Sequence, residues 1–180
     1  MRTLRNSLIP CILAVFLNIS CIRENIESPD EGLAVNDYLP EFTLTMNDGT
    51  EVSSDDLYGK ISVLVFFHTS CSDCRQELPE IQKIYTSYAT EDNITIIAIS
   101  REQSYDSVSE YWTKNNLSIP FSAQNDRKIY NLFATSGIPR IYISDDKLKI
   151  RFLFTDKSLP TSEQINTVIK QLQNEITATK

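Results

Sequence analysis

Apolar residues follow two patterns along this chain, unbroken runs and helical spacing. Ile61 to Phe67 is a run of β-branched and aromatic residues, and Asn93 to Ser100 is a second apolar run. Runs of this length favour strands that are buried on both faces of a sheet. The segment from Cys71 to about Ala89 carries apolar side chains three and four positions apart, as expected of an amphipathic helix. Strand, helix and strand in this order predict a right-handed parallel crossover unit.

The pattern predicts a hairpin ahead of this unit and more helices and strands after it. Phe42, Leu44 and Val52 flank Asn47-Asp48-Gly49, and an Asp-Gly step between apolar segments is typical of a hairpin turn. Two further helices are expected at Ser104 to Lys114 and Asp126 to Phe133, and an antiparallel strand pair at Arg140 to Ser144 and Lys149 to Phe154. A final amphipathic helix is expected from the helical spacing of Ile165, Val168, Ile169, Leu172 and Ile176. Together these elements predict an α/β fold with a central mixed sheet flanked by helices.

Residues 1 to 20 differ in character from the rest of the chain. Arg2 and Arg5 precede an apolar stretch from Ser7 to Leu17, which is too short to span a bilayer as a stable helix. This arrangement predicts a signal peptide over residues 1–20. The polar, acidic segment after it predicts a flexible tether over residues 21–34, followed by one domain over residues 35–180.

The composition is that of a globular protein. Of the 180 residues, 41% are hydrophobic and 23% are charged, which speaks against a disordered chain or a protein that spans the membrane several times. The formal net charge is −7, and loss of the two arginines of the signal peptide would make it −9. Nucleic acid and anionic lipid need a basic face, so we expect no nucleic-acid partner.

Four cysteines are present, and Cys11 lies inside the predicted signal peptide. Three would remain, an odd number for an exported protein, which usually marks a thiol with a special fate. Cys21 directly follows the signal peptide and resembles the lipidated first residue of a bacterial lipoprotein, although Asn18 stands where that motif usually has Leu. We therefore expect membrane attachment through a lipid on Cys21, in the cell envelope and facing the periplasm or the surface. Cleavage near Ser20 with Cys21 left free is the alternative.

Cys71 and Cys74 lie where the first predicted strand gives way to the helix. A helix N-terminus offers unpaired N–H groups and the positive end of the helix dipole, and both stabilise a thiolate. The three-residue offset puts both sulfurs on the first helical turn, with Cys71 at the open end and Cys74 turned inward. The pattern indicates a thiol–disulfide exchange pair in which Cys71 attacks and Cys74 resolves.

Two other interpretations of the pair remain. Structural zinc commonly needs four ligands, and His68 and Cys21 are the only further candidates, so we expect no metal and no cofactor. A permanent structural disulfide is the stronger alternative, although it would close a loop of only a few residues and restrict the unfolded chain little.

Four short motifs give the chain a family resemblance. They are Gly59-Lys60 before a buried strand, the Cys71/Cys74 pair, Glu77-Leu78-Pro79 in the helix, and Gly137-Ile138-Pro139 before a later strand. In this combination, the segment from Tyr38 to the C-terminus resembles the TlpA/ResA-like thioredoxins. The resemblance implies a thioredoxin fold, here with an N-terminal β-hairpin extension.

The resemblance also implies roles for residues near the cysteine pair. Pro139 would be cis and pack against the disulfide, and the backbone of Ile138 would pair with bound substrate. Glu77, one turn after Cys74, would tune the protonation of the pair and accept the proton of Cys74 as a general base. A solvated charge on the helix face is the alternative for Glu77.

The chain also departs from the family pattern. Ser70 and Asp73 stand where the family usually has Trp and Pro, and the carboxylate of Asp73 disfavours a nearby thiolate, which points toward a reductant. His68 could lower the pKa of the first cysteine or serve as a packing residue. Arg140 could form a positive rim of the substrate groove or face solvent as a strand residue.

These observations favour a thiol:disulfide oxidoreductase that reduces disulfides in exported proteins and is re-reduced by a membrane thiol electron donor. A peroxiredoxin-like peroxidase is one alternative. The peroxiredoxin pattern is Pro-x-x-x-Thr-x-x-Cys, and before Cys71 this chain has Leu64 in place of the Pro and His68 in place of the Thr. A non-catalytic thioredoxin-fold binding module with a structural disulfide is the other alternative.

Overall fold

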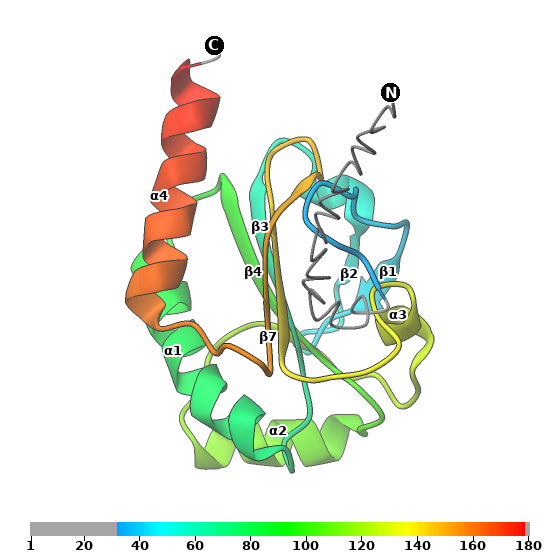
Figure 1. Cartoon of the computed structure of the whole chain (residues 1–180). Coiled ribbons are helices and arrows are strands. Elements are labelled where there is room, and N and C mark those ends of the chain that lie inside the picture. Colours follow the sequence, from blue (N-terminus) through cyan, green and yellow to red (C-terminus); the bar gives the residue numbers. More distant parts are fainter. Residues whose placement is uncertain (1–31, 179–180) are drawn as a thin grey trace, which may run out of the picture.

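A five-stranded sheet with the order β5-β4-β3-β6-β7 lies at the centre of the computed structural model, which describes residues 32–178 (Figure 1). The strands are β3 (Ile61–Phe67), β4 (Ile94–Ser100), β5 (Phe121–Ser122), β6 (Arg140–Ser144) and β7 (Ile150–Thr155). Strands β3, β4 and β5 run parallel to one another, whereas β6 and β7 are antiparallel to their neighbours. The predicted mixed sheet is therefore confirmed.

The other elements are a small hairpin and the helices. They are β1 (Thr43–Thr45), β2 (Glu51–Ser53), the 3-10 helix η1 (Ser54–Leu57), α1 (Ser72–Tyr88), α2 (Tyr105–Lys114), α3 (Lys128–Asn131) and α4 (Ser162–Ala178). Strands β1 and β2 pair antiparallel around the Asn47-Asp48-Gly49 turn, where Gly49 has a φ of 85°, as a turn of this kind requires. The predicted hairpin, strands and helices all occur, with ends that agree within a few residues.

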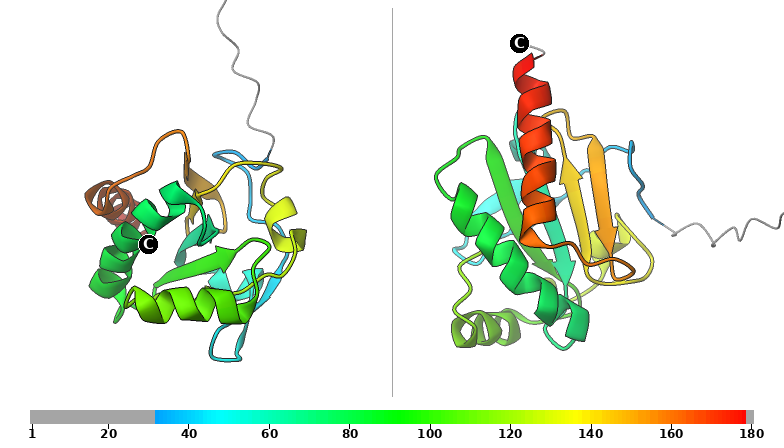
Figure 2. Two further views of the ribbon diagram at one scale, coloured as in Figure 1. Left: turned by 90° about the horizontal axis from the view of Figure 1, so that it is seen from below. Right: turned by 60° about the vertical axis from the view of Figure 1, so that its left-hand side comes forward.

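The central strand β3 is buried along its whole length. Its side chains alternate between two apolar clusters, because successive residues of a strand point to opposite faces. On one face, Val63, Val65 and Phe67 pack with residues of α1, α2 and α4, and on the other face Leu64 and Phe66 pack with the hairpin and with residues around α3. Figure 2 shows α1 and α4 together on one face of the sheet. The sheet is thus covered on both faces, and the end of β3 is held firmly.

Two features of the sheet differ from the sequence-based expectations. Strand β5 was not expected, since two residues are too few to give a pattern. Arg140 was expected either on a positive rim or facing solvent, and both expectations are wrong, because only 1% of its surface is exposed. It lies at the start of β6, which pairs with β3 on one side and with β7 on the other, and its Nε donates to the carbonyl of Ser136 at 2.9 Å.

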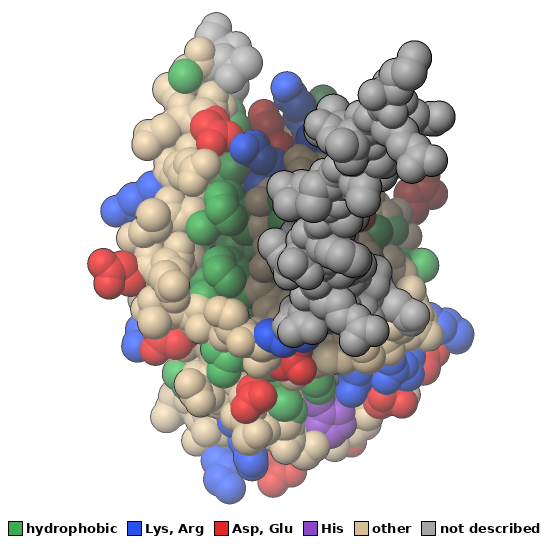
Figure 3. Space-filling view, viewed as in Figure 1, with side chains coloured by type: hydrophobic (Ala, Val, Ile, Leu, Met, Phe, Trp, Pro, Cys, Tyr) green, Lys and Arg blue, Asp and Glu red, His purple; other side chains and the backbone are tan. Residues whose placement is uncertain are grey.

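The predicted signal peptide and Cys21 lie outside the described residues. The first described residues pack on the domain: Gly32 forms a β-bridge with Ala134, and the N–H of Leu33 donates to the carbonyl of Phe133 at 2.8 Å. Within residues 32–178, none of the helices is long and apolar enough to cross a membrane. On the face shown in Figure 3, basic side chains stand beside acidic ones rather than in one broad patch.

Candidate active site

The candidate site begins where β3 ends and α1 begins. Cys71 is the N-cap residue of α1, with extended backbone angles, and its N–H donates to the carbonyl of His68 at 3.0 Å. Its own carbonyl accepts the first helical hydrogen bond, from Arg75 at 3.1 Å. The half-buried Cys71 therefore lies at the positive end of the dipole of a 17-residue helix.

Cys74 lies one turn further along α1 and has no exposed surface. Burial raises the pKa of its thiol well above the usual value, and the hydrogen bond with Cys71 and the nearby Asp73 carboxylate act in the same direction. The backbone N–H of His68 opposes this rise in pKa. Neither Cys71 nor Cys74 is in a disulfide, and the raised pKa favours the protonated form of Cys74.

The loop before β6 faces Cys71 across the site. The Ile138–Pro139 peptide bond is cis, which confirms the geometry that the family resemblance implied for Pro139. The thiol of Cys71 donates to the carbonyl of Ile138, with 3.7 Å between sulfur and oxygen. Ile138 is half-buried, whereas Pro139 is buried. Residues 67 positions apart in sequence thus meet at the first sulfur.

Glu77 is the buried carboxylic acid of α1, with 1% of its surface exposed. Burial, and to a lesser extent the charge of Glu80, raises the pKa of Glu77 to about 7. Its Oε1 atom has no hydrogen-bond partner among residues 32–178, which is costly for a charged oxygen. The alternative of a solvated helix-face charge is therefore wrong, and Glu77 can take up or release a proton near neutral pH.

His68 orders the turn that leads into Cys71. Its Nδ1 accepts the backbone N–H of Ser70 at 3.1 Å and lies 2.8 Å from the Ser70 hydroxyl. A ring nitrogen that accepts an N–H carries no proton, so the neutral ring holds its hydrogen on Nε2. Burial and the positive charge of Arg101 lower the pKa of His68, while Glu102 raises it. His68 thus orders the turn before Cys71 through its contacts with Ser70.

Sequence reasoning missed the side chains that hold the loops around this site. Gln103 accepts the N–H of Thr69 at 2.8 Å and donates to its hydroxyl at 2.6 Å, from 34 residues away. Tyr130 donates to the carbonyl of Gly137 at 2.6 Å, next to Ile138. No local pattern marks these residues, because their partners are fixed by how the loops meet in space.

Comparisons with known proteins agree with the fold and with the family resemblance. Thiol-disulfide oxidoreductase ResA from Bacillus thuringiensis (strain Al Hakam) is 24% identical over 142 residues, which cover 79% of this chain and 80% of ResA. Thioredoxin-like protein YneN from Bacillus subtilis (strain 168) is 31% identical over 120 residues, which cover 64% of this chain and 68% of YneN. Against nucleoredoxin 1 from Arabidopsis thaliana, the identity is 29% over 109 residues, and the chain spans only 19% of that protein.

The fold is shared with solved structures. A thiol:disulfide interchange protein of the thioredoxin family from Chlorobium tepidum TLS gives a TM-score of 0.67 at 20% identity, over 78% of this chain and 98% of that chain. The fold and the relatives define the class of protein, a thiol-disulfide oxidoreductase with a thioredoxin fold. Residues 35–153 match the AhpC/TSA family, and the chain belongs to this family. The resemblance to TlpA/ResA-like thioredoxins is thereby confirmed.

Proposed function

We propose that this protein reduces disulfides in exported proteins through Cys71 and Cys74. The observation that carries the proposal is the contrast between the two sulfurs. Cys71 is half-buried at the N-terminus of α1 beside the carbonyl of Ile138, whereas Cys74 is buried and its pKa is raised. This difference in burial suits Cys71 as the attacking thiol and Cys74 as the resolving thiol.

The reaction consists of two exchanges. The Cys71 thiolate attacks one sulfur of the substrate disulfide, forms a mixed disulfide and releases the other substrate sulfur as a thiolate. Cys74 then loses its proton and attacks the sulfur of Cys71, which releases the second substrate thiolate and leaves a Cys71–Cys74 disulfide. The substrate gains two electrons and the pair loses two, and a membrane thiol donor returns them by the reverse exchanges.

Glu77 is the proposed base for the second exchange. The buried Cys74 thiol must lose its proton before it can attack, because the thiolate is the nucleophile. A carboxyl group whose pKa lies at about 7 is matched to a proton transfer at neutral pH. Cys74 and Glu77 are three positions apart on α1 and both buried, so they lie on the same side of the helix.

Substrate binding is proposed at the cis-proline loop. The backbone of Ile138 would pair with an extended segment of the substrate, as the family resemblance implies. The 3.7 Å contact between the Ile138 carbonyl and the Cys71 sulfur supports this assignment, because a segment paired there would bring its own disulfide beside Cys71.

The reducing direction is proposed on the basis of Asp73. Its carboxylate raises the pKa of Cys74 and so disfavours the anionic form of the reduced pair. A pair whose reduced form is less stable gives up its electrons more readily. The cell envelope is the proposed location, with Cys21 as the lipid anchor.

Trapping tests the proposal directly. In the Cys74→Ser variant, attack by Cys71 remains possible but resolution is blocked, so exported proteins should accumulate as mixed disulfides on Cys71. Cys71→Ser is the matched control and should trap far fewer. Consumption of hydrogen peroxide without reduction of protein disulfides would favour the peroxidase instead. A Cys71–Cys74 disulfide that stays intact at thioredoxin-like potentials, about −270 mV, would favour the structural staple.

A further inference from the structure

Three consecutive carbonyl groups lead into the cis-proline loop, and each accepts a hydrogen bond from a side chain elsewhere in the chain. Arg127 Nη2 donates to Thr135 at 2.7 Å, Arg140 Nε to Ser136 at 2.9 Å, and the Tyr130 hydroxyl to Gly137 at 2.6 Å. We name these three donors, Arg127, Tyr130 and Arg140, the carbonyl brace. A loop without regular structure is thereby fixed up to the residue before Ile138.

Tyr130 is the member of the brace that holds the carbonyl of Gly137, the residue before Ile138. It is 1% exposed, and its ring packs edge-to-face with that of Phe66, with 5.6 Å between the ring centroids. The guanidinium carbons of Arg101 and Arg127 each lie over the ring at 4.9 Å from its centroid. Attraction between the cations and the ring holds the phenol in one orientation.

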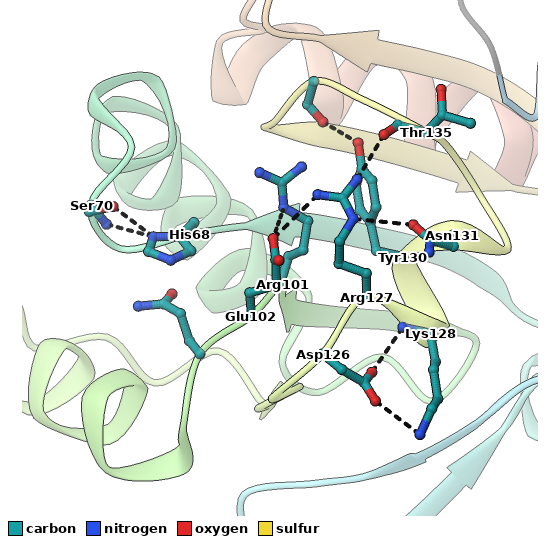
Figure 4. A network of polar contacts seen from close by, with 12 residues as sticks. His68, Ser70, Arg101, Glu102, Asp126, Arg127, Lys128, Tyr130, Asn131 and Thr135 are labelled. Carbon is teal, nitrogen blue, oxygen red and sulfur yellow. Dashed lines mark hydrogen bonds and ion pairs between the residues drawn. The ribbon is translucent and has the colours of Figure 1, made fainter.

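Glu102 ties the two arginines together (Figure 4). Its Oε2 lies 3.5 Å from Arg101 Nε and 3.3 Å from Arg127 Nη1. Arg127 also donates from Nε to Asn131 at 3.3 Å. The carboxylate between the guanidinium groups offsets their mutual repulsion, so both can stay close to Tyr130. The segment after β4 is thus linked to the loop before β6.

The hydrogen bond to Gly137 bears on Ile138 because a peptide group is planar. The carbonyl of Gly137 and the N–H of Ile138 belong to one peptide unit, and in a trans unit they point in opposite directions. A donor that fixes the Gly137 oxygen therefore fixes the direction of the Ile138 N–H. Gly137 has a φ of 80°, a left-handed angle that favours glycine.

We propose that Tyr130 is a positioning residue of this site. Its hydroxyl, held in place by Arg101 and Arg127, sets the orientation of the Gly137–Ile138 peptide, and through it the backbone that receives the substrate beside Cys71. Tyr130 touches neither sulfur nor substrate and acts through Gly137. The inference rests on the proposed role of Ile138 in substrate binding.

The test compares two phenylalanine substitutions. Tyr130→Phe keeps the ring and its contacts with Phe66 and the two arginines but removes the hydroxyl that holds Gly137. Tyr142→Phe is the matched control: it removes a buried hydroxyl that donates to the carbonyl of Phe133 at 3.1 Å, four residues further from Ile138. The Phe133 carbonyl keeps a second donor, the N–H of Leu33. Both variants are made in the Cys74→Ser background, so that a single attack by Cys71 is measured.

The readout is a ratio of rates. Mixed-disulfide formation is followed with a disulfide-bonded peptide, which needs the backbone of Ile138, and with a small aromatic disulfide, which does not. Tyr130→Phe should lower the peptide rate about tenfold, as expected for one lost hydrogen bond that leaves a buried partner unsatisfied, while the rate with the small disulfide stays within about twofold. Tyr142→Phe should leave the ratio unchanged.

The outcomes separate this inference from the proposed function. An unchanged ratio in Tyr130→Phe, or an equal fall of both rates, overturns the positioning role. An equal fall of the ratio in Tyr142→Phe overturns it too, because the effect would then be general loosening. Failure of the wild-type protein to turn over protein disulfides with a thiol donor would refute the reductase function, but the ratio would still report on Tyr130, since it needs only one attack by Cys71.

Discussion

Three positions along α1 separate a half-buried sulfur from one with no exposed surface. This difference follows from where the helix starts: its N-cap residue, Cys71, is only partly covered, whereas Cys74, one turn on, faces the core with Leu78 and Ile81. A buried thiol keeps its proton because the charged form would lose its hydration. At the scale of single residues, the two thiols of the site therefore differ in burial, and Glu77 is buried as Cys74 is.

Replacement of Glu77 by Gln should stabilise the fold in a pH-dependent way. Below about pH 4.5 the carboxyl is neutral in both states, so the substitution should change little. Between the usual pKa of 4.5 and the native value of about 7, the unfolded chain ionises first, and the folded wild type loses stability as the pH rises. The gain in Glu77→Gln should grow over this window and level off above pH 7, at no more than ~3 kcal/mol.

Urea unfolding of both proteins at a series of pH values measures this gain. Glu110→Gln serves as the control, because Glu110 is exposed on α2 and its substitution should change stability by less than about 0.5 kcal/mol at each pH. A gain in Glu77→Gln that is constant with pH would show that Glu77 does not hold its proton in the fold.

Replacement of Asp73 by Asn should raise the reduction potential of the cysteine pair. The carboxylate disfavours the thiolate form, so its removal stabilises the reduced pair. Asp73 comes after burial among the causes that raise the pKa of Cys74, and we expect a shift of up to about 30 mV, which corresponds to about 1.4 kcal/mol.

Equilibration of the variant with glutathione buffers measures the potential. Asp92→Asn is the control, since Asp92 is exposed between α1 and β4, away from the cysteines, and should leave the potential unchanged. No change in Asp73→Asn would remove the argument for a reductant, and a wild-type potential near the DsbA value of about −120 mV would make the protein a disulfide donor.

At the scale of elements, sequence and structure agree where a pattern is long. The apolar run of β3 and the helical spacing of α1 set both elements to within a residue, and the family motifs led to the cis bond at Pro139. Strand β5 was not predicted, because it has only two residues, which pair with Ala98 and Ile99. The burial of Arg140 was not predicted, because an arginine in a strand normally faces water, whereas here only 1% of its surface is exposed.

Helix α2 depends on one aromatic residue. Trp112 is 4% exposed, its ring centroid lies 4.9 Å from that of Phe67 at the end of β3, and its Nε1 donates to the carbonyl of Ile119 at 2.8 Å. Trp112→Phe should lower the free energy of unfolding by about 1–3 kcal/mol, because it loses packing and leaves a buried carbonyl without this donor. Tyr105→Phe, at an exposed position on the same helix, should cost less than about 0.5 kcal/mol.

Denaturant unfolding of these two variants provides the measurement, with far-UV circular dichroism as the signal, since Trp112 is the single tryptophan of the chain. Equal losses in the two variants would mean that α2 is held by its surface contacts and not by Trp112.

At the scale of the whole molecule, the first described residues pack against the segment that leads into the cis-proline loop, at Phe133 and Ala134. Gly32 lies so close to this loop that an added Cβ would come within 2.5 Å of the Phe133 carbonyl, so only glycine fits there. Thr135, the first residue whose carbonyl the carbonyl brace holds, follows Phe133 by two positions. The N-terminal segment is therefore part of the frame around the cis-proline loop.

Membrane attachment through Cys21 is the prediction that concerns the whole chain. Labelled fatty acid supplied to expressing cells should enter the wild-type protein and be absent from Cys21→Ala, which should be released from the membrane fraction. Cys11→Ala is the control and should keep the label, because Cys11 lies within the predicted signal peptide. Unlabelled wild-type protein in the soluble fraction would mean that Cys21 is left free.

The place of β3 in the sheet also bears on the order in which the protein can fold. Strand β4 follows it closely in the chain, but its other neighbour, β6, comes so much later that Ser62 pairs with Ser144 across the sheet. Contacts between such distant residues form slowly, because a long stretch of chain must first be closed. During synthesis, the two thiols and α1 can therefore assemble before the loop that will face them exists. A chain halted before residue 140 would present an unpaired edge of β3 together with both sulfurs, and is the form most prone to aggregation and stray disulfides.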